Sequence, residues 1–316
     1  MSRLLAAILA ALLPFAAQAQ YPSKPIRLIV PFPPGGAAEL GARIFAQPLG
    51  QALGQPIIIE TKPGADGAIA ADATMKAAPD GYTLMYATNT AFSWVPSVRK
   101  NPPYDPVADF TPVSKIGVFG FFVFSHPSVP ANSMAELLAH LRANPGKLNY
   151  GSGNSTAMLS TAQLVQQEKL DVVHIPYKGD GPLFVDLLGG RVQFAISTPG
   201  AAAPQVREGK LKVLATLLPS RSPLLPQAPT MAESGMKGMS ITPWGGVFGP
   251  KGMPREIADR LSRELIVLLR RPEVVEAFGK LAFEPRGSTP EELAAFTKEQ
   301  LQVWRRVVGE VGIKPE

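Results

Sequence analysis

At four predicted strand-to-helix junctions, glycine lies next to the start of a helix, where free backbone N–H groups can bind an anion. The first, "IVPFPPGGAAELGAR" at residues 29–43, runs from an apolar strand through prolines and glycines into an alanine-rich helix. Gly35 and Gly36 let the backbone approach a bound group closely, and the start of the following helix offers N–H groups with partial positive charge. This chemistry suits a phosphate, a catalytic oxyanion or a free carboxylate.

The same arrangement recurs three times along the chain. It appears in "KPGADGAIAAD" at 62–72, "NYGSGNSTAM" at 149–158 and "IPYKGDGP" at 175–182. Open α/β sheets bind ligands at the carboxyl ends of their strands, where all these junctions fall. A tight turn explains any one junction, and Ser155 is also a good helix N-cap. Together the junctions favour an anion-binding cleft over unrelated turns.

Motifs of common catalytic and metal sites are missing from the sequence. The first junction matches neither the G-x-x-x-x-G-K-[ST] nor the G-x-G-x-x-G phosphate loop, and no H-E-x-x-H or G-x-S-x-G motif occurs. His126, His140 and His174 stand apart, and His174 alternates within a strand as a structural residue does. The acidic residues lack the spacing of a calcium loop. The sequence therefore predicts no enzyme activity, no metal and no cofactor.

Composition narrows the choice of partners. The chain has 31 Lys and Arg residues against 25 Asp and Glu, without a basic cluster or stripe. This mild excess favours small anions and argues against nucleic acid. The sequence contains no cysteine, which excludes thiol nucleophiles, iron–sulfur clusters and cysteine-ligated zinc.

The N-terminal residues have the pattern of an export signal. Arg3 precedes the apolar run "LLAAILAALLPFAA", and Ala17-Gln18-Ala19 matches an A-x-A cleavage signal. The run is shorter than the ~20 residues that a membrane-spanning helix needs. We therefore expect cleavage after Ala19 and a soluble protein in the periplasm.

The elements that position the junctions alternate between strand and helix. Apolar runs at 26–31, 56–60 and 82–88 predict strands with a helix in each interval. This βαβαβ order is typical of a parallel sheet. Pro48 falls inside the first helix and predicts a kink or a break there.

A second alternating set follows a proline-rich connection. Residues 114–127 predict one or two apolar strands, and strands and helices then alternate up to a loop-like segment at 219–239. Capping boxes at Ser133 and Thr289 predict the starts of two helices.

This order predicts an α/β protein with two lobes. We expect a signal peptide at 1–19, a first lobe at 20–119 plus 225–316, and a second lobe at 120–224. Two crossings of the chain make a hinge with a cleft between the lobes, and ligands prefer such interfaces.

Six longer stretches carry a family resemblance. "YPSKPIRLIVPFPPGG", "PGADGAIAADATMKAAPDGYTL", "PYDPVADFTPVS", "NPGKLNYGSGN", "IPYKGDGPLFVDLLGGRV" and "GIKPE" resemble the Bug-type substrate-binding proteins of tripartite tricarboxylate transporters. The resemblance runs from Tyr21 to Glu316. It implies a fold like that of type II periplasmic binding proteins, capture of a small organic carboxylate, and delivery to membrane permease subunits without chemistry or a cofactor. We expect a monomer.

The resemblance also implies which loops bind the ligand. In the family, the first two strand–helix loops hold a ligand carboxylate through backbone groups and ordered water, and two loops of the second lobe close over its other end. The matching residues and their neighbours at strand ends are Pro33, Pro34, Gly35, Gly36, Ala37, Ala38, Glu39, Gly64, Ala65, Gly67, Ala68, Ile69, Thr88, Asn89, Ser152, Asn154, Ser155, Thr156, Tyr177, Lys178, Gly179, Ser197 and Thr198.

Departures from the family pattern bear on the ligand. Ala37, Ala38 and Glu39 stand where relatives commonly have two hydroxyl residues and an aspartate, which leaves carboxylate contacts to the backbone. Ser197 and Thr198 stand where many relatives have an aspartate, the natural partner of an ammonium group.

We therefore expect a carboxylate without a charged amine. Phe92 and Trp94 follow Asn89 closely, and they favour an apolar or aromatic ligand body.

Two other functions would use the same cleft. A sensory binding protein would present its liganded form to a membrane receptor kinase, and the sequence does not separate that role from transport. An exported hydrolase would need a catalytic acid–base pair, which the sequence does not place.

Overall fold

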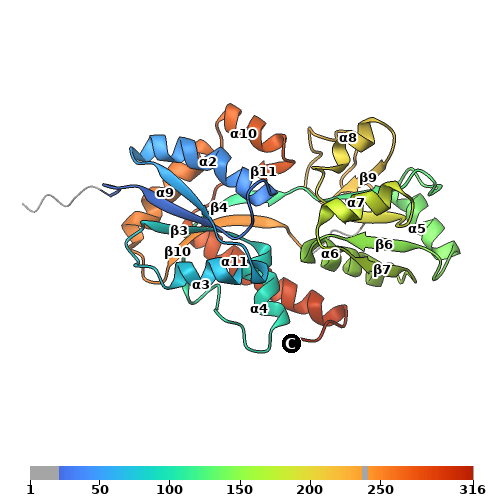
Figure 1. Ribbon diagram of the computed structural model, residues 1–316, viewed down its shortest axis with the longest axis horizontal. Coiled ribbons are helices and arrows are strands. Elements are labelled where there is room, and N and C mark those ends of the chain that lie inside the picture. The colour runs from blue at the N-terminus through green and yellow to red at the C-terminus, as the bar shows by residue number, and fades with distance from the viewer. Residues whose placement is uncertain (1–20, 237–240, 316) are drawn as a thin grey trace, which may run out of the picture.

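The computed structural model describes residues 21–236 and 241–315, which form two lobes, each built on its own sheet (Figure 1). Helices and strands alternate through both lobes, which confirms the predicted α/β class. The predicted signal peptide at 1–19 and its cleavage point lie outside the described residues.

The first lobe contains a six-stranded sheet in the order β11-β4-β10-β3-β1-β2. β1 lies parallel to β2 and to β3, which confirms the predicted βαβαβ start. β10 runs antiparallel to β3 and β4, and β11 runs antiparallel to β4. The strands are β1 (Ile26–Val30), β2 (Ile57–Thr61), β3 (Thr83–Thr88), β4 (Phe110–Phe119), β10 (Trp244–Pro250) and β11 (Phe283–Pro285).

Helices cover both faces of this sheet (Figure 1). One face packs around Phe45 and Phe278, and the other packs around Phe92 and Trp244. In the described ranges, no helix is long and apolar enough to cross a bilayer. The helices of this lobe are α2 (Ala37–Leu53), α3 (Ala68–Met75), α4 (Val95–Val98), α9 (Arg255–Leu268), α10 (Pro272–Gly279) and α11 (Pro290–Glu310).

The helix α2 continues without a break through Pro48. Proline lacks the N–H that would bond the carbonyl group four residues earlier. Phe45, Leu49 and Leu53 on either side of this gap are buried in the core, and their packing holds the helix together across the missing hydrogen bond. A break at Pro48 is therefore wrong, and the alternative of a kink stays a prediction.

The second lobe contains a five-stranded sheet in the order β7-β6-β8-β5-β9. β6 lies parallel to β7 and β8, so these three strands end at the same edge. β5 runs antiparallel to β8 and β9. The strands are β5 (Phe122–Ser125), β6 (Asn149–Ser152), β7 (Val173–Pro176), β8 (Phe194–Ser197) and β9 (Lys212–Thr216), and the helices are α5 (Met134–Ala143), α6 (Ser155–Gln167), α7 (Asp180–Leu188) and α8 (Ala202–Arg207).

One predicted capping box forms in full and the other in half. At α11, the Thr289 hydroxyl accepts from the Glu292 N–H, and the Glu292 carboxylate accepts from the Thr289 N–H. At α5, the Ser133 hydroxyl accepts from the Glu136 N–H at 3.2 Å. The Glu136 carboxylate instead accepts from the N–H of Asn132, one residue before the cap.

The first crossing between the lobes depends on glycine. A Cβ added at Gly117 would lie 2.1 Å from the Glu284 carbonyl oxygen, and one at Gly120 would lie 2.4 Å from the Ala282 carbonyl oxygen. Only glycine lets the chain around β11 pass so close to this crossing.

The return crossing starts with a segment that packs on the second lobe. Leu225 and Ala228 join the core that contains Phe122 and Phe124, and Met231 joins the core on the other face of this sheet. We therefore propose that the chain returns to the first lobe after Met236, later than residue 225.

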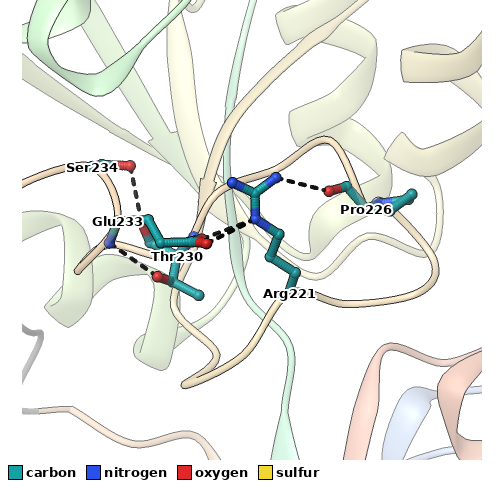
Figure 2. Close-up of polar contacts among 5 residues, drawn as sticks. All are labelled: Arg221, Pro226, Thr230, Glu233 and Ser234. Carbon is teal, nitrogen blue, oxygen red and sulfur yellow. Dashed lines mark hydrogen bonds and ion pairs between the residues drawn. The ribbon is translucent and has the colours of Figure 1, made fainter.

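Polar contacts fasten this segment, as Figure 2 shows. Arg221 Nε donates to both carboxylate oxygens of Glu233 at 3.0 Å, and Arg221 Nη1 donates to the Pro226 carbonyl at 3.3 Å. Thr230 and Glu233 exchange two hydrogen bonds through their side chains and N–H groups. These bonds keep the segment compact before it enters β10.

The two lobes also touch through α6 and α11. Leu159 of α6 packs with Trp304 and Val307 of α11 in one apolar cluster. Gln166 Nε2 donates to the Glu310 carbonyl at 2.7 Å. The C-terminal helix therefore belongs to the first lobe but supports the second.

Candidate ligand-binding cleft

The carboxyl ends of the parallel strands in the two lobes face each other. Asn89 follows β3, and Thr156 lies in the first turn of α6 after β6. Asn89 Nδ2 donates to Thr156 Oγ1 at 2.7 Å, and Asn89 Oδ1 accepts from the Trp244 N–H at 3.1 Å. Because Asn89 and Thr156 are only 3% and 4% exposed, this contact is a buried link between the lobes.

A cavity of ≈ 230 Å³ opens between the same edges. Gly35 and Ala37 line it from the first lobe, and Thr198, Pro199 and Gly200 line it from the second. We call the space between the two facing edges, including this cavity, the cleft.

The loop after β1 is braced by its own acid. The Glu39 carboxylate accepts from the Gly35 N–H at 3.0 Å and pairs with Arg43, and its side chain is 2% exposed. The Gly35 N–H and the Glu39 carboxylate are therefore used inside the loop. Pro33, Pro34 and Ala37 remain exposed at the surface, Gly36 is half-buried, and Ala38 is buried at the start of α2.

The loop after β2 adopts a strained backbone. Gly64, Ala65, Asp66 and Gly67 have φ values of +125°, +47°, +56° and +93°. Non-glycine residues rarely adopt positive φ, and such strain clusters at functional sites. Ala68 is half-buried at the start of α3, and Ile69 beside it is 51% exposed.

At the start of α6, the Ser155 hydroxyl is not used to cap the helix. Asn154 caps this helix, because its Oδ1 accepts from the Ala157 N–H at 2.9 Å. The alternative that Ser155 serves as the cap is wrong. The Ser155 hydroxyl is buried and has no hydrogen-bond partner within residues 21–236 and 241–315, so it can donate to a ligand.

Ser152 forms a pair with His174 that sequence spacing did not reveal. The Ser152 hydroxyl lies 2.7 Å from His174 Nε2, and Tyr150 stacks on the imidazole with ring centroids 4.8 Å apart. Burial lowers the pKa of His174 below its ordinary value. The pair arises because these residues point to one face of the neighbouring strands β6 and β7. Among the described residues no carboxylate hydrogen-bonds the imidazole, so the pair has no third member.

The loop after β7 is also tied to its own lobe. The Tyr177 hydroxyl donates to Asp186 at 2.8 Å, and Arg191 pairs with the same carboxylate. Burial and this carboxylate raise the pKa of Tyr177 to about 12. Gly179 has a φ of +110° that favours glycine, and Lys178 is exposed without an ion pair in the described part of the chain.

Asp180 is a cleft residue that the sequence pattern did not reveal. Its Oδ2 accepts from the Thr198 hydroxyl at 2.8 Å, and its Oδ1 accepts from Asn154 Nδ2 at 3.3 Å. The stretch "IPYKGDGP" contains this acid, but nothing in the spacing showed that it reaches the end of β8. The second lobe therefore does present a carboxylate at this edge, which removes one reason for expecting a ligand without an amine.

The aromatic residues after Asn89 do not form a cleft wall. Phe92 is fully buried among Phe110, Trp244 and Phe248. Trp94 packs edge-on against Trp304, with ring centroids 6.4 Å apart. Both positions follow from the short π-helix at Thr90–Trp94, which turns these side chains into the core.

Three buried hydroxyl groups without partners lie at the facing edges. Thr88 ends β3, Ser155 starts α6 and Ser197 ends β8, and the hydroxyl oxygen of each has no hydrogen-bond partner among the residues that the structure describes. Each neighbours a residue that reaches the facing edge or lines the cavity. An unpaired buried hydroxyl is costly, so a polar ligand that bonded these three groups would be favoured.

The match to a family model decides the identity of the chain. Residues 41–313 match the tripartite tricarboxylate transporter family receptor. The chain belongs to this receptor family. The predicted resemblance is therefore confirmed.

Similar proteins match most of the length of this receptor, and two solved ones share its fold. BugT of Bordetella pertussis is 38% identical over 301 residues, covering 93% of this chain and 91% of BugT. An R. palustris protein solved with adipate is 31% identical, with a TM-score of 0.81 over 94% of this chain and 100% of that one. MatC of Rhodopseudomonas palustris, solved with bound malate, is 28% identical, with a TM-score of 0.74 over 91% of this chain and 100% of that one.

Proposed function

We propose that this receptor captures a small organic carboxylate in the cleft and delivers it to a membrane transporter. The observation that carries the proposal is the set of unpaired hydroxyls of Thr88, Ser155 and Ser197 at two facing edges, linked by Asn89 and Thr156. Hydroxyl groups donate to carboxylate oxygens, and a ligand would satisfy them in the buried site. Two relatives hold the carboxylates adipate and malate.

We also propose that the receptor performs no chemical step. The Ser152–His174 pair is the arrangement that most resembles a catalytic one, but Ser152 is 4% exposed and its partner imidazole has no orienting carboxylate in the described residues. Activation of a serine needs a base that a third group orients. This pair therefore serves the packing of β6 against β7.

We propose that the receptor acts in the periplasm. Arg3, the apolar run and Ala17-Gln18-Ala19 support export and cleavage after Ala19. We propose that the mature receptor is a monomer, because a lone receptor can close its own cleft. Mass spectrometry of the mature N-terminus tests the cleavage point.

A thermal-shift screen tests carboxylate binding. Protein is unfolded, washed and refolded to remove retained ligand, then melted with mono-, di- and tricarboxylates, amino acids and neutral controls. A ligand at a hundredfold excess over its Kd adds about 2.7 kcal/mol to the free energy of unfolding, which raises the melting temperature by roughly 5–10 °C.

A double variant serves as the control. Thr88→Val with Ser155→Ala removes two hydroxyl donors at facing edges, and it should abolish the shift while the unliganded protein still melts cooperatively. If no carboxylate raises the melting temperature of the refolded wild type, the proposed function is wrong.

A further inference from the structure

We propose that Asp180 selects a ligand whose far end carries a hydrogen-bond donor, an ammonium or a hydroxyl group, in place of a second carboxylate. This inference rests on the proposed function, in which the ligand's first carboxylate binds in the cleft. It assigns Asp180 a role in choosing among carboxylates.

The fold brings Asp180 to the cleft from an adjacent loop. β6, β7 and β8 are parallel, so the residues that follow them share one edge of the second lobe. Asp180 begins α7, and its two oxygens bond Asn154 after β6 and Thr198 after β8. Thr198 in turn lines the cavity opposite Gly35 and Ala37 of the first lobe. Asp180 is therefore one hydrogen bond from the cavity.

The backbone near Asp180 leaves space for its side chain. A Cβ added at Gly153 would lie 2.3 Å from Asp180 Oδ1 and 2.7 Å from the Asp180 N–H nitrogen. Glycine at 153 therefore makes room for this carboxylate. The first turn of α7 is also a favourable place for a negative charge.

Both hydrogen-bond partners of this carboxylate in the described residues are neutral. Its two partners are an amide and a hydroxyl, and no Lys, Arg or His lies within ion-pair distance of it in the described part of the chain. A carboxylate accepts about four hydrogen bonds, so Asp180 keeps capacity for a ligand donor. The uncompensated charge attracts an ammonium or a hydroxyl group and repels a second carboxylate.

The Thr198 hydroxyl does not oppose this preference. Because it donates its proton to Asp180, it cannot also donate to a ligand carboxylate at the same edge. The competing feature on the same loop is Lys178, which is exposed and unpaired in the described residues and would suit a second carboxylate. Lys280 also lines the cavity, but its ammonium group already pairs with Glu276. Asp180 and Lys178 therefore predict opposite preferences, which an experiment can separate.

Matched ligands of equal length test the proposal by calorimetry. The six-carbon set is hexanoate, 6-hydroxyhexanoate, 6-aminohexanoate and adipate, and the four-carbon set is butanoate, 4-hydroxybutanoate, 4-aminobutanoate and succinate. In at least one set, the wild type should bind the amino or hydroxy acid about tenfold or more tightly than the dicarboxylate.

Two variants assign the effect to the acid. Asp180→Asn keeps the size of the side chain and removes its charge, so it should cancel the preference and strengthen dicarboxylate binding by about tenfold. Lys178→Met is the matched control on the same loop, and it should leave the preference in place. Cooperative melting of both variants shows that they fold, and Thr198→Val supplies a second change next to the carboxylate that should keep or increase donor preference.

One result would overturn the inference but leave the proposed function standing. In it, the wild type binds the dicarboxylates most tightly, and this preference is unchanged in Asp180→Asn and lost in Lys178→Met. Failure of every acid in both sets and in the wider thermal-shift screen overturns both. A preference for amino or hydroxy acids that disappears only in Asp180→Asn supports the inference.

Discussion

Single residues in the loop after β2 hold a backbone shape that most side chains resist. Gly67 combines a φ of +93° with close neighbours, since a Cβ there would lie 2.9 Å from Ala91 Cβ and 3.1 Å from Pro31 Cβ. Gly35 has a similar φ of +83°, but a Cβ there meets nothing within 4 Å. Substitutions at these two glycines can therefore separate the cost of a positive φ from the cost of steric overlap.

We expect Gly67→Ala to destabilise the protein more than Gly35→Ala does. Each variant bears the cost of a non-glycine residue at positive φ, roughly 1–3 kcal/mol, and Gly67→Ala adds the overlap with Ala91 and Pro31. Chemical denaturation of both variants and the wild type measures the difference. Equal losses in the two variants would show that the neighbours of Gly67 yield freely.

His174 should make stability depend on pH. Burial lowers its pKa in the folded protein below the ordinary value of 6.5, so the unfolded chain takes up the proton first as the pH falls. The contribution of neutral His174 is complete above about pH 6.5 and is lost as the pH falls below it, until the folded-state pKa is passed.

The measurement compares melting temperatures of the wild type and His174→Gln between pH 8 and pH 5. The wild type should lose more stability than the variant over the acidic part of this range. Parallel curves for the two proteins would contradict the assigned role of the imidazole.

At the scale of elements, helix caps decide which groups remain free. The box at α11 is complete, and Thr289 and Glu292 satisfy each other's N–H groups. At α6 the cap moves one residue earlier than Ser155, to Asn154, which leaves the Ser155 hydroxyl for the cleft. A local choice between two adjacent residues thus alters the binding site.

We expect Thr289→Ala to lower the free energy of unfolding by about 1 kcal/mol. The change removes the hydroxyl that accepts from the Glu292 N–H, and Thr289→Ser is the matched control because it keeps that hydroxyl. Urea denaturation measures both. If the serine variant lost as much free energy of unfolding as the alanine variant, the threonine methyl group rather than the cap would carry the effect.

At the scale of the whole molecule, two kinds of contact hold the lobes together. Asn89 and Thr156 meet at the cleft, while Leu159, Trp304 and Val307 pack away from it. The first contact depends on the facing strand ends, and the second ties the C-terminal helix to the second lobe.

We expect Thr156→Val to weaken the Asn89–Thr156 link between the lobes. The variant keeps the shape of the side chain but removes the hydroxyl that accepts from Asn89 Nδ2. Loss of a neutral hydrogen bond worth about 0.5–1.5 kcal/mol should reduce ligand affinity roughly two- to tenfold. Small-angle X-ray scattering of the unliganded variant should show a larger radius of gyration than the wild type, and identical scattering would refute the link.

Local patterns in the sequence determined much of this protein. Alternating apolar runs predicted the βαβαβ start of the first lobe, and serine or threonine three residues before glutamate predicted two helix starts. The longer motifs predicted the receptor family, which the match over residues 41–313 confirms. Predictions from such features succeed because the features depend on neighbours within a few residues along the chain.

Only the tertiary structure decided which groups meet in the cleft. Glu39 turns back onto its own loop, Ser152 finds His174, and Asp180 reaches Thr198, 18 residues away in the chain. Pro48 stays helical because apolar packing outweighs one missing hydrogen bond. These outcomes depend on how strand ends and helix faces are juxtaposed, and residues distant in sequence become neighbours only when the sheets assemble.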